Sequence, residues 1–151
     1  MTTTTEDVTL RLAAAADAPA VRDLVAAAGL PLAGLDDVWV TVVAVRPDGT
    51  LAAVAALERH GAGETTAFLL RSVVVEPAHR GTGLGRRLVA ATLAHVDPTA
   101  PVALLTETAA PWFDRLGFAR VARGDLPPSL AGSVELVSAC PASATAMLRR
   151  T

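Results

Sequence analysis

The stretch VVVEPAHRGTGLGRRL, residues 73–88, decides the fold. Its β-branched run predicts a strand that ends at Pro77, and an amphipathic helix is predicted from Gly85 to Val96 beyond a glycine-rich loop. Glycines let backbone N–H groups approach a ligand closely, and a helix N-terminus adds a positive dipole. The stretch therefore indicates a pyrophosphate site, and the candidates for charge-assisted contacts there are Arg80, Arg86 and Arg87.

The rest of the chain alternates short strands with helices. Apolar and β-branched runs predict strands at residues 8–12, 39–46, 51–58, 66–75, 101–106, 118–123 and 144–149. Helical periodicity predicts helices at 17–28, 85–96 and 109–116, with a further candidate at 127–138. Turn signals between the second, third and fourth strands predict an antiparallel meander ahead of the glycine loop. With no repeats or linkers, this order predicts one mixed α/β domain over residues 1–151.

Composition excludes several classes of protein. The chain has 151 residues, of which 52% are hydrophobic and 19% charged, so it can bury a core. Its net charge of −2 and its lack of a basic block argue against nucleic-acid binding. No apolar run reaches the roughly 18 residues of a membrane span, and the N-terminus has no signal-peptide features. With one cysteine and no internal disulfide, a cytoplasmic protein without a membrane partner is expected.

The residue types that are missing restrict the chemistry further. All 13 basic residues are arginine, and lysine and tyrosine do not occur. A Schiff base, a Walker-type phosphate loop and a phenolic general acid are therefore excluded. The single cysteine and the three scattered histidines lack the spacing of a metal site, so no metal is expected.

The loop is similar to the signature of one enzyme superfamily. It reads G-x-G-x-G in mid-chain, which departs from the G-x-G-x-x-G that follows the first strand of a dinucleotide-binding fold. It resembles instead the R/Q-x-x-G-x-G/A signature of GNAT acetyltransferases, with Arg80, Gly83 and Gly85 at the marked places. Downstream, residues 112–118 (WFDRLGF) resemble the second GNAT landmark, F-Y-x-K/R-x-G-F. The resemblance covers nearly the whole chain, and a glycine-rich turn without a ligand is the alternative.

The resemblance implies a fold and a cosubstrate. The GNAT fold is an α/β fold with a mixed, mostly antiparallel central sheet, splayed between strands 4 and 5, and helices on both faces. Acetyl-CoA would place its pantetheine along the main chain of Val73, Val74 and Val75, and the N–H of Val74 would polarise the thioester carbonyl. An amine would attack directly and the CoA thiolate would leave. The residues implied to hold the rest of the cosubstrate are Arg80, Gly81, Thr82, Gly83, Leu84, Gly85, Arg86, Thr106 and Phe113. Relatives are often dimers, so a homodimer is also expected.

Phe113 departs from the family pattern. It stands where the second landmark usually carries a tyrosine that protonates the leaving thiolate. One interpretation is that the protein binds CoA without catalysis, as a sensor. The favoured interpretation is that the acid is dispensable, because a thiol with a pKa of ~8.5 leaves tolerably as thiolate at neutral pH.

Candidate acceptor residues lie near the ends of the third and fourth strands. Glu58 is the candidate base for the attacking amine, with a water or a plain surface carboxylate as alternatives. Arg71 and Ser72 are candidates for binding the substrate, with Arg71 either clamping a carboxylate or facing solvent. Cys140 either lines the acceptor pocket or is a small buried hydrophobe. Glu76 and His79, at the loop rim, either relay water or are simply solvated.

A narrower resemblance concerns the acceptor. Residues 69–75 (LLRSVVV), 104–108 (LLTET) and 140–147 (CPASATAM) are similar to the arsenic-resistance N-acetyltransferases. The implied function is acetyl transfer to the amine of a small molecule, with an arsenic-containing or other amino acid as candidate acceptor. The alternatives are acetylation of a protein or peptide amine and a non-catalytic CoA-binding sensor. An NAD-dependent oxidoreductase is a distant further alternative.

Overall fold

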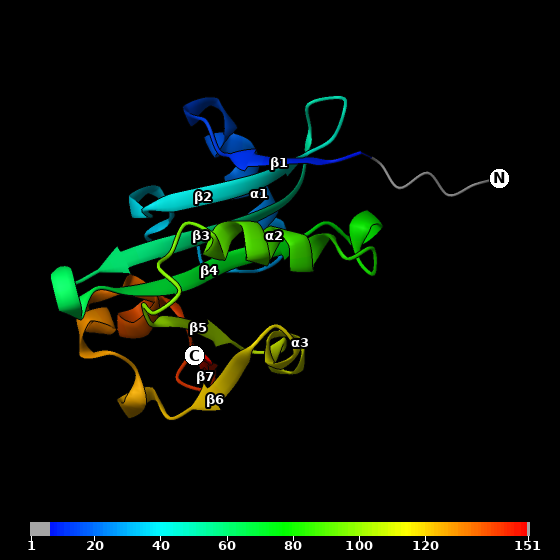
Figure 1. The fold of residues 1–151 in the computed structure, drawn as a ribbon. Coiled ribbons are helices and arrows are strands. Elements are labelled where there is room, and N and C mark those ends of the chain that lie inside the picture. The colour runs from blue at the N-terminus through cyan, green and yellow to red at the C-terminus, as the bar shows by residue number, and fades with distance from the viewer. Residues whose placement is uncertain (1–6, 151) are drawn as a thin grey trace. The chain divides into compact units, whose positions relative to one another are not determined.

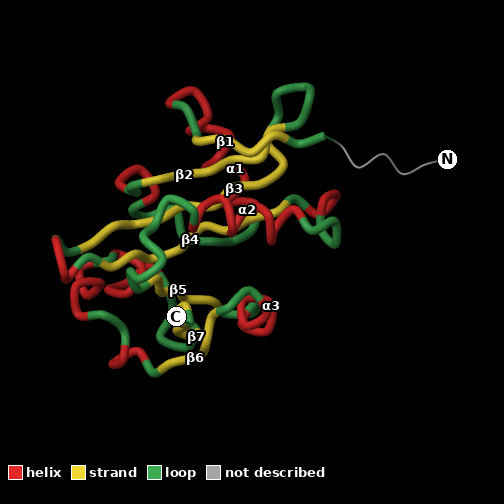
Figure 2. Tube along the Cα trace, in the orientation of Figure 1, coloured by secondary structure: helices red, strands yellow, loops and turns green. Residues whose placement is uncertain are grey.

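The computed structural model describes residues 7–150 (Figure 1). Its strands are β1 (Thr9–Leu12), β2 (Val40–Val45), β3 (Leu51–His60), β4 (Ala67–Val75), β5 (Val102–Thr106), β6 (Phe118–Val121) and β7 (Thr145–Arg149). Its α-helices are α1 (Ala18–Ala27), α2 (Leu84–Leu93) and α3 (Ala110–Arg115). The seven strands and the helices predicted at 17–28, 85–96 and 109–116 are present, with bounds shifted by a few residues. Short 3-10 turns lie in the loops between them (Figure 2).

The strands form one seven-stranded mixed sheet in the order β1-β2-β3-β4-β5-β7-β6. The β1–β2, β5–β7 and β6–β7 pairs are antiparallel, whereas β4 and β5 are parallel. The parallel ladder consists of Phe68 with Val102 and Leu69 with Ala103, although both strands continue beyond it. The mixed α/β sheet expected from the sequence is therefore confirmed.

The chain divides into two compact units that share β3 and β4. Among the described residues, unit 1 comprises 7–32, 40–56 and 72–95, and unit 2 comprises 33–39, 57–71 and 96–150. The expectation of a single domain stays a prediction.

Unit 1 is built on β1, β2 and the first part of β3. α2 packs against β2 through its apolar face, with Leu84, Leu88 and Val89 buried. α1 buries Val21 and Val25, and in Figure 1 it lies behind the strands that α2 crosses in front. This packing fixes α2, and therefore the loop that precedes it, against the sheet.

Unit 2 has its own apolar core beneath a long C-terminal segment. Leu69 and Ala103 pack there with Leu126, Leu130 and Ala146. The candidate helix at 127–138 was wrong: a 3-10 turn covers Pro128–Gly132 and a single π-helical turn covers Glu135–Ala139. The reason is tertiary, since Ser133 and Glu135 turn inward to contact Glu58 and Arg71, which are distant in the sequence. This irregular backbone carries two residues of the candidate active site.

Candidate active site

The glycine loop of unit 1 joins β4 to α2. Gly81 and Gly83 have φ values of 78° and 82°, in the left-handed region that favours glycine. A Cβ at either position would meet no atom within 4 Å, so the space over this backbone is open. Because α2 begins at Leu84, the N–H groups of its first turn have no acceptor within the helix. The loop therefore fits a phosphate group, as expected from its sequence.

Arg46 of unit 1 holds the segment that leads into this loop. Its Nη2 donates to Glu76 Oε1 at 2.6 Å, and its Nε donates to His79 Nε2 at 3.2 Å. His79 is 7% exposed, and its carbonyl accepts a hydrogen bond from the Thr82 hydroxyl. The interpretation as a solvated rim residue is thus wrong for His79, whereas the Glu76 side chain is bound by Arg46 and remains 34% exposed. Both residues fix the start of the loop.

The end of β4 has an unusual backbone. Ser72 has a φ of 56° and is the one residue other than glycine with a positive φ among residues 7–150. Such a residue within a strand is typical of a β-bulge, which re-aims the groups that follow it. Those groups are the amides of Val73, Val74 and Val75, the segment expected to meet pantetheine. Their contact with pantetheine stays a prediction.

A buried charge cluster occupies unit 2, and we call Glu58, Arg71 and Glu135 the triad. Arg71 Nη1 donates to Glu58 Oε2 at 2.9 Å, and Arg71 Nε lies 3.2 Å from Glu135 Oε2. The Arg71 side chain is 0% exposed, and the two carboxylate side chains are nearly as buried. The hydroxyl of Ser133 donates to Glu58 Oε1 at 2.7 Å, and His60 Nε2 lies 2.8 Å from the same oxygen. The expected alternatives of a surface carboxylate at Glu58 and a solvent-facing Arg71 are therefore wrong.

The two glutamates of the triad differ in electrostatics. Burial acts to raise the pKa of Glu58, but its hydrogen-bond partners and the charge of Arg71 outweigh burial, so the pKa of this carboxyl is lowered. Burial raises the pKa of Glu135, and the attraction of Arg71 does not offset it. One guanidinium cannot neutralise two carboxylates, and the negative charge of Glu58 further disfavours ionisation of Glu135. Paired groups whose pKa values are pushed apart are typical of acid–base assignments.

The triad changes the roles expected of Arg71 and Cys140. Arg71 is already held by two carboxylates, so clamping a substrate carboxylate requires one of them to give way. Burial, followed by the neighbouring Glu135, raises the pKa of Cys140 to about 12. Cys140 Sγ lies 3.5 Å from Glu135 Oε1, so the neutral thiol acts as a donor. These observations favour the interpretation of Cys140 as an inert, half-buried side chain.

Thr106 and Phe113 belong to unit 2 and have structural contacts there. The Thr106 hydroxyl accepts a hydrogen bond from the N–H of Ala109 at 3.0 Å, just before α3. Phe113 is 6% exposed and packs edge-on against Trp112 and Phe118, with ring centroids 4.8 and 5.9 Å away. Their contact with the cosubstrate stays a prediction.

Sequence reasoning missed Ser133 and Glu135. Both lie in the segment expected to be a candidate helix, and neither belongs to a motif. The one available signal was two polar residues within an otherwise apolar stretch, SVELV at 133–137. Among residues 7–150, no group of three or more histidine, cysteine, aspartate or glutamate side chains is arranged to hold a metal ion. Within the same range, no helix is long and apolar enough to cross a membrane.

The sheet order and the glycine loop at a helix N-terminus define a class, the α/β acyltransferases that use a CoA thioester. The family model described as an acetyltransferase (GNAT) domain matches residues 36–120, more than half of the chain. The chain belongs to the GNAT acetyltransferase family, whose acyl donor is acetyl-CoA. The enzyme class and cosubstrate expected from the sequence are therefore confirmed.

Solved structures show the same fold at low sequence identity. N-acetylglutamate synthase from Neisseria gonorrhoeae, in a complex with coenzyme A and N-acetyl-glutamate, has a TM-score of 0.75 at 22% identity over 95% of this chain. This chain spans only 35% of that protein's length. YhbS of Escherichia coli, in complex with CoA, has a TM-score of 0.63 at 20% identity over 79% of this chain and 72% of its own.

A third structure matches nearly end to end. A GNAT-family acetyltransferase from Staphylococcus aureus Mu50 has a TM-score of 0.71 at 13% identity over 94% of this chain and 98% of its own. A comparison with curated proteins gives no match. The structural likenesses establish the fold, and the acceptor must be argued from this chain's own residues.

Proposed function

We propose that the chain transfers the acetyl group of acetyl-CoA to the amine of a small molecule that carries a carboxylate. The observation that carries the donor half of this proposal is the open glycine loop at the N-terminus of α2. The backbone of Arg80 to Arg86 binds the pyrophosphate, with the side chains of Arg80 and Arg86 adding charge. Val73 and Val75 align pantetheine, and the N–H of Val74 stabilises the oxyanion. Thr106 and Phe113 are further proposed contacts, which rest on the family resemblance alone.

The attacking amine must lose a proton, and a carboxylate of the triad takes up that proton. Glu58 was the expected base, but its lowered pKa makes it a weak one. Glu135 is the better base, because burial raises its pKa and a carboxylate of raised pKa takes up a proton more readily. Proton uptake by Glu135 also removes one of the two negative charges that compete for Arg71. Arg71 is then available to an acceptor carboxylate, with Ser72 next to it in the chain.

The acceptor class follows from this arrangement and from the narrower family resemblance. An amino acid carries both the amine and the carboxylate, and the three segments similar to arsenic-resistance enzymes add arsenic-containing analogues to the candidates. We further propose that the enzyme is cytoplasmic and works as a homodimer. It has no nucleic-acid or membrane partner in this proposal. The inert thiol of Cys140 leaves arsenic recognition to the rest of the acceptor site.

The test is acetylation of a panel of amines followed by mass spectrometry. The panel holds amino acids, arsenic- and phosphorus-containing glutamate analogues, polyamines, aminoglycosides and short peptides. Acetylation of carboxylate-bearing small amines, with loss of kcat in Glu135→Gln at neutral pH, is the expected result. Acetylation of peptides alone would replace the small-molecule proposal by a protein acceptor. Tight CoA binding with no product would identify a sensor instead.

A further inference from the structure

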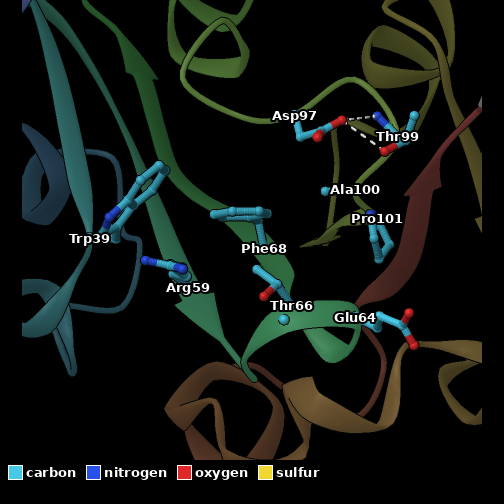
Figure 3. A pocket seen from close by; sticks show the side chains of 10 residues that line it. Trp39, Arg59, Glu64, Thr66, Phe68, Asp97, Thr99, Ala100 and Pro101 are labelled. Atoms are coloured by element: carbon cyan, nitrogen blue, oxygen red, sulfur yellow. Dashed lines mark hydrogen bonds between the residues drawn. The ribbon is translucent and has the colours of Figure 1, made fainter.

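A pocket of about 460 Å³ lies within unit 2, and none of its lining residues has a role in the proposed reaction (Figure 3). Its volume falls in the range of roughly 300 to 1,000 Å³ that is usual for small-ligand sites. It is bordered by the start of β4, the end of β3, the turn between them and the loop that leads into β5. The residues that carry the argument are Trp39, Arg59, Glu64, Phe68 and Asp97.

Two aromatic rings form the apolar part of this pocket. Trp39 and Phe68 have ring centroids 5.2 Å apart and an interplanar angle of 45°. Phe68 is 5% exposed, but Trp39 remains 42% exposed although it is among the largest apolar side chains of the protein. A flat ligand group against these rings would bury the indole that the fold leaves open.

One cation already contacts this aromatic pair. Arg59 Cζ lies 5.7 Å from the centroid of the Trp39 ring, a cation–π arrangement that keeps the indole in place. Figure 3 shows Trp39 and Arg59 on one side of Phe68, and Asp97 with Thr99 on the other. The pocket therefore has an aromatic side with a guanidinium and a side that carries carboxylates.

The carboxylates are Glu64 and Asp97. Asp97 Oδ1 accepts hydrogen bonds from the N–H and the hydroxyl of Thr99 at 2.8 and 2.7 Å, which fixes the orientation of the carboxylate. These two bonds lower the pKa of Asp97, so the group is ionised at neutral pH. The lining residues thus carry two carboxylates and one guanidinium, and the guanidinium of Arg149 binds the carbonyls of Asp97 and Ala100 at 3.1 and 2.8 Å from outside the lining.

We propose that this pocket binds a small ligand that joins a flat apolar group to an ammonium group. The flat group packs against Phe68 and Trp39, and the ammonium lies toward Asp97 and Glu64. Exposed aromatic rings with acidic groups nearby recognise cations by combined stacking and charge attraction. The proposal does not depend on the acetyl-transfer reaction, so the binding experiment is carried out without acetyl-CoA.

The composition of the chain provides a reporter inside the pocket. The protein has two tryptophans and no tyrosine, so in Trp112→Phe the indole of Trp39 is the only strong fluorophore. We would titrate this variant with 2-phenylethylammonium and follow Trp39 emission. A saturable change is expected. 3-Phenylpropionate, similar in size but negatively charged, should bind at least about tenfold more weakly, and 2-cyclohexylethylammonium, which lacks the flat ring, several-fold more weakly.

Charge variants sharpen the test. Asp97→Asn keeps an acceptor for Thr99 while it removes the charge, and Glu64→Gln is the matching change on the other carboxylate. Each should raise the Kd about three- to fivefold, and the effect should shrink at high salt. Asp23→Asn on the exposed surface of α1 is the control and should leave the Kd unchanged.

Two outcomes would overturn the proposal. One is equal affinity for the anionic and cationic compounds. The other is the absence of saturation up to about 10 mM, weaker than a useful small-ligand site. A urea unfolding curve of each variant confirms that a lost signal does not come from an unfolded chain.

Discussion

The glycine loop of unit 1 and the triad of unit 2 differ in the exposure of their charged side chains and in how far apart these lie in the sequence. Arg80 and Arg86 of the loop are exposed and lie within a few residues of one another, and the backbone between them forms the site. The triad is buried and brings together Glu58, Arg71 and Glu135 from three separate segments. A local motif can therefore specify where an anion binds, whereas the protonation state of a buried group is set by partners distant in the sequence.

The strongest test of this contrast compares one arginine from each region. Arg71→Met leaves two buried carboxylates without their cation and should lower the free energy of unfolding by about 3–5 kcal/mol. Arg80→Met removes an exposed side chain and should change it by less than about 0.5 kcal/mol while raising the KM for acetyl-CoA. Urea unfolding and steady-state kinetics measure both. Equal stability losses would show that the triad is not an enclosed charge centre.

Ionisation of the two glutamates of the triad should change the free energy of unfolding in opposite directions. The lowered pKa of Glu58 means that its ionised form stabilises the fold above its ordinary pKa, and that this is lost as the pH falls through the folded pKa. Glu58→Gln should therefore cost about 2–4 kcal/mol at neutral pH, and the difference from wild type should vanish in acid.

Glu135 should behave in the opposite sense. Its raised pKa means that ionisation destabilises the fold above the folded pKa, and that this cost disappears as the pH falls. Glu135→Gln should be neutral or stabilising at neutral pH, with the difference from wild type again vanishing in acid. Unfolding curves for both variants across this pH range measure the two differences. A large loss of stability in Glu135→Gln at neutral pH would contradict the assignment.

A smaller effect on stability distinguishes the conformational role of a loop glycine from its role in binding acetyl-CoA. Gly83→Ala forces a non-glycine residue to a φ of 82° and should cost about 1 kcal/mol. Gly49 is the matched control, since its φ of 89° and its open surroundings are similar but it lies in the β2–β3 turn. Both alanine variants should lose similar stability, and only Gly83→Ala should raise the KM for acetyl-CoA. A parallel rise in Gly49→Ala would attribute the effect to general destabilisation.

The smallest expected effect concerns the missing tyrosine. Phe113→Tyr restores the family's usual residue, and we expect kcat to change by less than about threefold because the thiolate leaves without an acid near neutral pH. The pH dependence of kcat provides the measurement. An increase above about tenfold would show that protonation of the thiolate limits the natural protein.

The sequence predicted the features that are set by neighbouring residues, and it did not predict those that depend on contacts between distant residues. The strands, the helix after the glycine loop and the loop itself followed from hydrophobic periodicity and glycine spacing. The burial of Glu58 did not follow, because a carboxylate beside an arginine near a strand end is usually exposed, and its partner Ser133 lies 75 residues away. The left-handed backbone at Ser72 had no signal, since serine gives no indication of a positive φ. The turn at Glu135–Ala139 was misjudged because inward-facing polar residues are set by tertiary contacts.

The place of β7 in the sheet affects how the protein is made in a cell. β7 is the last of the seven strands to be synthesised, yet it lies between β5 and β6, and Leu148 pairs with Ala103 on one side and Ala119 on the other. Until β7 leaves the ribosome, β5 and β6 have edges that their antiparallel partner has not yet covered. The first three strands of unit 1, by contrast, are neighbours both in the sheet and in the order of synthesis. Translation speed and chaperone access during the interval between β6 and β7 should therefore govern the yield of unit 2 more than that of unit 1.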